Sequence, residues 1–276
     1  MVLTSPAEAA EKGDTPYKIQ ADGVSKYFVQ NGRPLAVLEN VDLYALEGEL
    51  VSIIGPSGCG KSTLLNIISG LDQPSEGSIF LNGRRAEHRL GAVGYMQQKD
   101  LLLPWRNVLD NAIIGLELQG VPRSVARDRA AELMDQFGLK GFEKEYPFAL
   151  SGGMRQRASF LRTVLADQEV FLLDEPFSAL DALNRAHIQE WLLGLWESLN
   201  KTIVLVTHDV DEAVFLSSRV YVMTARPGRI KLMEQVDLPR PRTVEMLTQA
   251  RYVSLKAMLL ATIRQESEPM PREAGR

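Results

Sequence analysis

The chain has 276 residues and a formal net charge of −4, with 45% hydrophobic and 24% charged residues, an ordinary composition for a globular protein with a sizeable core. The acidic balance argues against a strong binder of nucleic-acid backbones, because such proteins concentrate Lys and Arg on one face. The single cysteine, Cys59, excludes a disulfide framework and a cysteine-rich metal site, and three histidines are too few for a metal cluster.

The N-terminal residues 1–16 predict a short disordered lead. They lack the basic segment and apolar core of a secretory signal, and they are rich in Ala, Glu, Pro and Gly. No later segment reaches the roughly 18 to 20 consecutive apolar residues that a membrane-spanning helix needs. A role at a membrane would therefore require a partner that spans it.

Residues 17–55 predict an antiparallel layer followed by a buried strand. Alternation in YKIQADGVSKYF and AVLENVDLYAL indicates two strands joined by the turn QNGRP. GELVSIIG is a short apolar run, typical of a strand that is covered on both faces. A glycine-rich loop then leads into KSTLLNIISGL, which has helical spacing, and GSIFLNGR and AVGYMQQ are two further strand candidates.

A helical insert is predicted next, with residues 99–160 taken as a helical subdomain. The segments VLDNAIIGLELQG, SVARDRAAELMDQFGL and FEKEYPFAL have helical periodicity with Gly and Pro breaks. Helices and strands then alternate up to RVYVMTA, which indicates a mostly parallel sheet in an α/β fold. Residues 17–240 would form one domain with this insert, and residues 241–276 a helical tail.

The sequence GPSGCGKS lies between a predicted strand and a predicted helix and matches the P-loop pattern G-x-x-x-x-G-K-[ST] in full. Its glycines let the backbone curl so that N–H groups converge on phosphate, and the helix N-terminus adds partial positive charge. In this pattern the lysine reaches the β- and γ-phosphates and the serine binds Mg²⁺. The predicted nucleotide-binding residues are Gly55, Pro56, Ser57, Gly58, Cys59, Gly60, Lys61, Ser62 and Thr63.

Two further motifs carry chemistry. Asp174 and Glu175 end the apolar run VFLLDEP, and beside a P-loop the first can hold the Mg²⁺ water shell while the second polarises an attacking water. Elsewhere such a pair is usually a solvated strand end. LSGGMRQR places Ser151, Gly152 and Gly153 at a predicted helix start, which forms a second anion site or, alternatively, a simple serine N-cap.

The P-loop, LSGGMRQR, VFLLDEPFSALD and LVTHD, in this order and at this spacing, resemble the nucleotide-binding subunit of an ABC transporter over about residues 17–239. The resemblance implies a P-loop NTPase core of the ABC type, with an antiparallel β layer and a helical insert. It also implies ATP hydrolysis with ATP and Mg²⁺ as cofactors. In that family two subunits sandwich two ATP molecules, so a second copy of the chain is an expected partner.

The resemblance assigns roles to individual residues. Glu175 matches the general base that activates the hydrolytic water, and Asp174 matches the carboxylate associated with Mg²⁺. His208 matches the switch histidine near the γ-phosphate, where a structural hydrogen-bonding role is the plain alternative. Asp181 in SALD matches a loop that crosses the dimer interface, and its alternative is a helix N-cap.

Two assignments leave a choice open. Spacing to Pro104 favours Gln98 over Gln97 as the glutamine that touches Mg²⁺ and water, with either one possible. Phe28, next to Tyr27, matches the aromatic residue that stacks on adenine, and a core aromatic is the alternative.

Two features concern what the ATPase is coupled to. In KDLLLPWRNVLDN, Leu101 to Leu103 and Trp105 form an apolar group of the kind that marks a partner site or packs into the helical insert. In the family, the cleft here receives a coupling helix from the membrane subunit. LLPWRNVLDN, ARPGRI and VDLPRPR also resemble the importers of nitrate, taurine, alkanesulfonates, bicarbonate or thiamine-precursor pyrimidines, which use separate membrane subunits and a separate solute-binding protein.

We therefore expect a peripheral ATPase at the cytoplasmic face of the cell (inner) membrane that energises import of a small solute. Its partners would be integral-membrane permease subunits and, indirectly, a periplasmic or extracellular solute-binding protein, with no nucleic acid. The alternatives are a soluble ABC-type ATPase that acts on nucleic acid or ribosomes, an exporter ATPase, and a P-loop kinase. The about 52 residues between Gln98 and Ser151 are too few for the coiled coil of repair ATPases, and a kinase leaves LSGGMRQR without a purpose.

Overall fold

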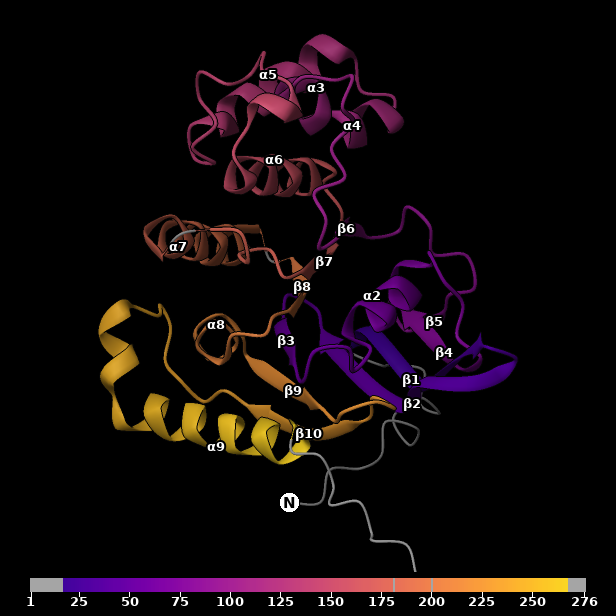
Figure 1. Cartoon of the computed structure of the whole chain (residues 1–276). Coiled ribbons are helices and arrows are strands. Elements are labelled where there is room, and N and C mark those ends of the chain that lie inside the picture. The colour runs from indigo at the N-terminus through magenta and orange to yellow at the C-terminus, as the bar shows by residue number, and fades with distance from the viewer. Residues whose placement is uncertain (1–16, 181, 200, 268–276) are drawn as a thin grey trace, which may run out of the picture.

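The computed structural model describes residues 17–180, 182–199 and 201–267, and Asp181 lies outside these ranges. Two sheets and a helical lobe make up the molecule (Figure 1). The first sheet is antiparallel and has the order β2 (Arg33–Leu46), β1 (Tyr17–Gln30), β4 (Glu76–Leu81) and β5 (Arg84–Arg85). The predicted antiparallel layer is thus confirmed, and GSIFLNGR belongs to it.

The second sheet has six strands, in the order β10 (Ile230–Gln235), β9 (Arg219–Met223), β3 (Leu50–Ile54), β8 (Thr202–Val206), β7 (Val170–Asp174) and β6 (Gly94–Met96). Its strands are parallel except for β10, which pairs antiparallel with β9. The expectation of a mostly parallel sheet is therefore confirmed. β10 has no counterpart among the predicted strands, because its partly exposed edge residues lack a clear alternation.

Alternate residues of the parallel strands pack against different layers, since successive side chains of a strand point to opposite faces. In β3, Leu50 and Ile54 join the core beneath the larger helical layer. Val51 and Ile53 face the other way and pack with α2 (Lys61–Ser69) and the antiparallel sheet. Both faces are covered, which is why these strands read as unbroken apolar runs.

The helical lobe contains α3 (Val108–Ala112), α4 (Ile114–Leu118), α5 (Arg123–Met134), the 3₁₀ helix η1 (Pro147–Ala149) and α6 (Gly152–Leu165). It stands beyond the β6 edge of the sheet (Figure 1). VLDNAIIGLELQG forms two short helices rather than one. The helix predicted for FEKEYPFAL is wrong, because Pro147 disfavours helical backbone before it and only the short η1 forms there.

The remaining helices are α7 (Ala182–Leu199), α8 (Val210–Leu216), the 3₁₀ helix η2 (Val244–Thr248) and α9 (Ala250–Ser267). In Figure 1, α9 lies along the β10 edge and below α8. Within residues 241–267 the chain thus forms η2 and α9. Among the described residues, no helix is both long enough and apolar enough to cross a bilayer.

Candidate active site

The P-loop joins the carboxyl end of β3 to the N-terminus of α2. Gly60 has a φ of 111°, and a Cβ atom at this position would lie 2.6 Å from the Leu38 side chain of β2. Only glycine therefore lets the loop pass so close to the antiparallel sheet. Lys61 is buried, and its ammonium donates to the carbonyls of Gly55 at 2.8 Å and Pro56 at 3.0 Å. The loop's own carbonyls thus hold this cation beside the cavity.

A cavity of about 240 Å³ opens above the P-loop. Its wall combines loop and helix residues with residues from four other segments of the chain: Val37, Ser57, Gly58, Gly60, Lys61, Ser62, Thr63, Gln98, Glu175 and Arg226. The hydroxyls, backbone N–H groups and cations of this wall suit a polyphosphate. Cys59 is buried beneath the loop, which agrees with a packing role.

Glu175 brings the predicted catalytic residues together. It directly follows β7 and has a φ of 49°, the left-handed conformation that residues other than glycine rarely adopt. Its Oε2 lies 3.2 Å from Nε2 of Gln98 and 3.3 Å from Nδ1 of His208. These residues follow β6, β7 and β8, so three adjacent strands aim one side chain each at a common point. Strained backbone of this kind concentrates at functional sites.

Asp174 lies at the end of β7 and is buried. Burial raises the pKa of Asp174, a hydrogen bond from the Ser62 hydroxyl lowers it, and the neighbouring Glu175 raises it. Its Oδ1 is buried and has no hydrogen-bond partner among the residues that the structure describes. An unpaired carboxylate oxygen beside the Ser62 hydroxyl, with the Gln98 amide on the same cavity, is the kind of oxygen-donor set that suits Mg²⁺.

The described residues contain no cluster of three or more His, Cys, Asp or Glu side chains that could hold a metal ion by itself. Mg²⁺ characteristically keeps waters and takes one or two carboxylates together with substrate phosphates. The donor set around Asp174 therefore fits Mg²⁺ that arrives with a nucleotide.

The segment LSGGMRQR, residues 150–157, is called the signature here, and it lies outside the P-loop cavity of its own chain. Ser151 is the N-cap of α6 and its Oγ accepts a hydrogen bond from Met154 N at 3.3 Å, as the N-cap alternative requires. Ser151 and Gly152 are exposed and Gly153 is half-buried, and none of the three lines the P-loop cavity. The start of α6 is therefore open to a ligand that another molecule presents.

The remaining predicted residues are distributed as follows. The structure places Gln98 against Glu175, whereas Gln97 is half-buried and does not line the cavity. Phe28 on β1 is 41% exposed, and Lys26 Nζ lies 5.0 Å from its ring centre, but Phe28 does not line the P-loop cavity. Tyr27 is also exposed.

Arg226 is part of the site and was not predicted. Its Nε and Nη2 donate to the Gly58 carbonyl at 3.1 and 2.8 Å. The loop that carries it is pressed against the P-loop, since a Cβ atom on Gly228 would lie 2.2 Å from the Cys59 carbonyl oxygen. Arg226 belongs to the segment ARPGRI, which in the sequence alone indicates only the resemblance to importers of small solutes.

Two arginines of α6 hold the segment that follows Gln98, and they too were not predicted. Arg155 Nε lies 3.1 Å from Asp100 Oδ2, and Arg162 donates to the carbonyls of Asp100 at 2.7 Å and Leu101 at 2.8 Å. Gln156 of the same helix donates to the Glu175 carbonyl at 2.9 Å. Helix α6 is therefore hydrogen-bonded both to the segment that follows Gln98 and to the backbone of Glu175.

Known proteins share this sequence and architecture. The model of the ABC transporter family matches residues 38–178. The aliphatic sulfonates import ATP-binding protein SsuB of Bacillus cereus is 45% identical over 225 residues, which cover 82% of this chain and 88% of that protein. The formylaminopyrimidine import ATP-binding protein ThiZ of Halalkalibacterium halodurans is 43% identical over 234 residues, 84% of this chain and 91% of that one.

Among solved structures, a dimeric ATP-binding cassette in a post-hydrolysis state bound to ADP and Pi matches with a TM-score of 0.72 and 31% identity. The match covers 80% of this chain and all of the other. Its fold agrees with the two sheets and the P-loop cavity described above. The chain therefore belongs to the ABC transporter family and is an ATP-binding and ATP-hydrolysing subunit of that family.

Proposed function

We propose that this ATPase energises the import of a small solute through a membrane permease and works as a pair of copies with Mg²⁺·ATP. The observation that carries the proposal is the meeting of Gln98, Glu175 and His208 at the P-loop cavity, with the signature start of α6 outside it. A cavity that lacks its own signature is half of a composite site. The import direction is supported by the relatives SsuB and ThiZ, both named as import ATP-binding proteins.

The chain's own residues perform the chemistry. Lys61 and the P-loop N–H groups bind the β- and γ-phosphates. Ser62, Asp174 and Gln98 would hold Mg²⁺, which would supply positive charge against the charge that develops on the phosphates. Glu175 takes a proton from the water that attacks the γ-phosphorus. The bond between the γ-phosphorus and the bridging oxygen breaks, which yields ADP and inorganic phosphate. His208, whose Nδ1 lies 3.3 Å from Oε2 of Glu175, would contact the γ-phosphate.

The second copy would supply the missing wall. Ser151, Gly152 and Gly153 at the exposed start of α6 carry a hydroxyl, free N–H groups and the positive end of a 14-residue helix. Placed against the γ-phosphate of the opposite copy, they would close the cavity, with Asp181 and Phe28 as further proposed contacts to the interface and to adenine. A likeness to a dimeric cassette bound to ADP and Pi supports this arrangement.

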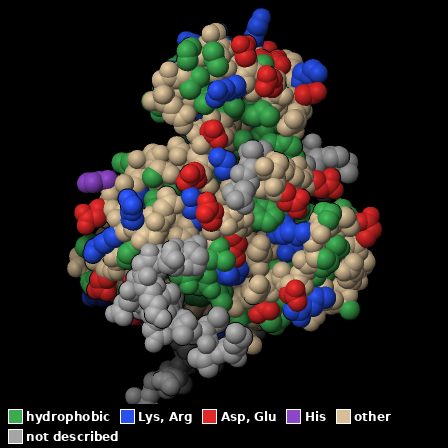
Figure 2. All heavy atoms as spheres, turned by 180° about the vertical axis from the view of Figure 1, so that it is seen from behind, with side chains coloured by type: hydrophobic (Ala, Val, Ile, Leu, Met, Phe, Trp, Pro, Cys, Tyr) green, Lys and Arg blue, Asp and Glu red, His purple; other side chains and the backbone are tan. Residues whose placement is uncertain are grey.

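An exposed apolar surface on the helical lobe fits the permease. Trp105 is 72% and Phe148 82% exposed, and the Phe148 ring stacks on Tyr146 with 5.7 Å between centroids and 8° between planes. The two segments are neighbours, since Val108 N donates to the Glu145 carbonyl at 2.8 Å. In Figure 2, hydrophobic side chains reach the surface of this lobe among charged side chains of both signs. Such patches mark protein–protein contacts.

The experiment that tests the proposal is purification of the tagged chain from membranes of its source, with assay of ATP turnover before and after removal of what accompanies it. We expect a multi-helix membrane protein to co-purify and to stimulate turnover. Recovery of ribosomes or nucleic acid in place of a membrane protein would overturn the transport role while leaving the ATP chemistry intact. A solute-binding protein that stimulates the complex only from outside would establish import over export.

A further inference from the structure

The short helix α8 begins directly after His208. Asp209 is its N-cap, with Oδ1 accepting from the backbone N of Asp211 at 2.8 Å and of Glu212 at 3.4 Å. No flexible residue therefore separates the histidine from the helix. Any tilt or shift of α8 moves the backbone of His208 relative to Glu175, which lies 3.3 Å from the imidazole.

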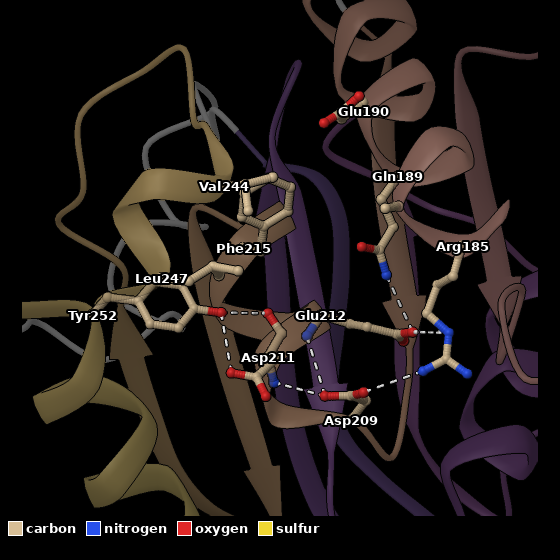
Figure 3. A pocket seen from close by; sticks show the side chains of 11 residues that line it. Arg185, Gln189, Glu190, Asp209, Asp211, Glu212, Phe215, Val244, Leu247 and Tyr252 are labelled. Carbon is tan, nitrogen blue, oxygen red and sulfur yellow. Dashed lines mark hydrogen bonds and ion pairs between the residues drawn. The ribbon is translucent and has the colours of Figure 1, made fainter. Parts of the chain in front are cut away.

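The C-terminal helix α9 holds the first turn of α8. Tyr252 is 1% exposed, and its hydroxyl lies 3.0 Å from the carbonyl oxygen of Asp211 and 3.3 Å from Oδ1 of the same residue (Figure 3). Lys256, one turn further along α9, forms an ion pair with Asp211 Oδ2 at 2.6 Å. The tail is therefore bonded to Asp211, which lies three positions after His208.

The segment before α9 holds the other end of α8. Arg242, 7% exposed, donates through Nη1 to the carbonyls of Val214 and Phe215 at 2.9 Å and Ser217 at 2.7 Å. These are carbonyls of the last turn, which lack partners within the helix, and a cation there also complements the helix dipole. Burial lowers the pKa of Arg242 to about 10, so the guanidinium is charged at neutral pH. VDLPRPR is therefore a cap for α8.

The side of α8 that faces α7 is loosely packed. A cavity of about 210 Å³ opens between α7, α8 and the tail, and the view in Figure 3 shows polar side chains bridging it. Arg185 of α7 lies 3.6 Å from Asp209 and 3.8 Å from Glu212. The apolar residues of α8 pack into the core, whereas the side that faces this cavity has polar contacts. The polar contacts at the two ends therefore help to set the position of the helix.

We propose that residues 239–260 are a positioning element for His208. By holding α8 at both ends, they set the distance between the imidazole and Glu175, and thereby the rate of hydrolysis. This inference rests on the role proposed above for His208 in turnover. Tyr252, Lys256 and Arg242 are positioning residues, since none of them lines the P-loop cavity.

The test uses the full chain and compares a double variant, Tyr252→Phe with Lys256→Met, with the wild type. We expect kcat for ATP to fall about five- to tenfold while KM stays within about twofold, because small misplacement of a reacting group costs rate more than binding. Lys256→Arg, which keeps the ion pair, is expected to retain at least half of the wild-type kcat. If the substitutions acted only by impairing folding, the amount of active enzyme would fall to the same degree in the double variant and in Lys256→Arg.

Lys231→Met is the matched control. It breaks the ion pair of Lys231 with Glu266 at 3.1 Å, which ties the far end of α9 to β10 and does not touch α8. We expect this variant to leave kcat unchanged. Equal kcat values in Lys231→Met and in the double variant would overturn the proposal.

His208→Ala separates the two levels of inference. If it loses turnover and the double variant does not, only the positioning role fails. If it keeps full turnover, the proposed role of His208 fails and the positioning role with it. If both hold, the double variant is expected to lower kcat by less than twofold further in the His208→Ala background, since both changes act through one group.

Discussion

At the scale of single residues, the site depends on a few side chains whose backbone or burial is unusual. Glu175 has a left-handed backbone at the end of a buried strand, and Gln98 and His208 approach its carboxylate from the neighbouring loops. Asp174 is buried beside it with one oxygen unpaired. Arg226 braces the P-loop from outside through a carbonyl. We expect each of these features to affect either the binding of the nucleotide or its hydrolysis.

Arg226→Ala tests the brace on the P-loop. Two charge-assisted hydrogen bonds to Gly58 keep the loop in place and add positive charge to the cavity wall. Because such an interaction contributes about 1.5 kcal/mol, we expect KM for ATP to rise about tenfold with kcat within about twofold. Arg229→Ala is the control, since Arg229 lies in the same loop and pairs with Glu39 instead. Equal KM values in the two variants would contradict the assignment.

Glu212 makes stability depend on pH. Burial raises the pKa of Glu212, and a hydrogen bond from Thr207 only partly lowers it. Since the folded-state pKa is the higher one, this residue's stabilising contribution is complete below the unfolded-state pKa and is lost as pH rises through the folded-state pKa. Above the folded-state pKa the native protein therefore contains a desolvated carboxylate.

Glu212→Gln removes that charge and keeps an oxygen that can accept from Gln189, as Glu212 does at 3.2 Å. We expect the variant to have a Tm a few degrees above wild type at pH 8, since about 1 kcal/mol corresponds to about 2–4 °C in a chain of this size. The difference should shrink toward pH 4. Thermal melts over this pH range check the prediction, and a gap that widens on acidification would refute it.

At the scale of elements, the signature helix α6 connects the site to the helical lobe. Arg155 and Arg162 hold the backbone and side chain of Asp100, two residues after Gln98, and Gln156 holds the Glu175 carbonyl. A shift of Gln98 on binding ATP would therefore move α6 and with it the apolar surface of the lobe. We propose that these bonds couple the nucleotide site to the apolar surface of the lobe.

Trp105→Ala tests that surface. The side chain is largely exposed, so its removal should leave the fold and the basal ATPase activity within about twofold of wild type. Stimulation by the purified permease is expected to fall severalfold, because exposed aromatic residues often dominate binding at interfaces. Val253→Ala, an exposed apolar residue of α9, serves as the control. Loss of basal and stimulated activity to the same degree would favour a packing role for Trp105.

At the scale of the whole molecule, the P-loop cavity and the signature lie apart in one chain, and the proposed composite site would need two copies. Glu175→Gln should bind ATP and lose about 10² to 10⁴ of the turnover rate, since a general base contributes about that much. We expect this variant to run as a dimer in size-exclusion chromatography with Mg²⁺·ATP. Lys61→Ala, which should weaken ATP binding, is expected to stay monomeric. A monomeric Glu175→Gln with bound ATP would contradict the composite site.

The sequence alone determined the local chemistry. The three motifs GPSGCGKS, VFLLDEP and LSGGMRQR each lie at the end of a strand or the start of a helix. The backbone geometry that phosphate and Mg²⁺ require is set by the few residues of each motif. Alternating and unbroken apolar runs indicated the two kinds of sheet for the same reason, since strand periodicity is local. Where a proline competed with helical periodicity, as in FEKEYPFAL, the local pattern was misleading.

Only the tertiary structure decided which groups meet. Gln98 and Glu175 are 77 positions apart, and Arg226 and Gly58 are 168 apart, so their contacts depend on strand order and loop packing that residue spacing does not encode. The same holds for Arg242 and Tyr252, whose bonds to the two ends of α8 are the basis for the proposed positioning of His208. A motif can be recognised in the sequence because a few consecutive residues set its backbone geometry. The grouping of catalytic side chains depends on packing between residues that are far apart in the sequence.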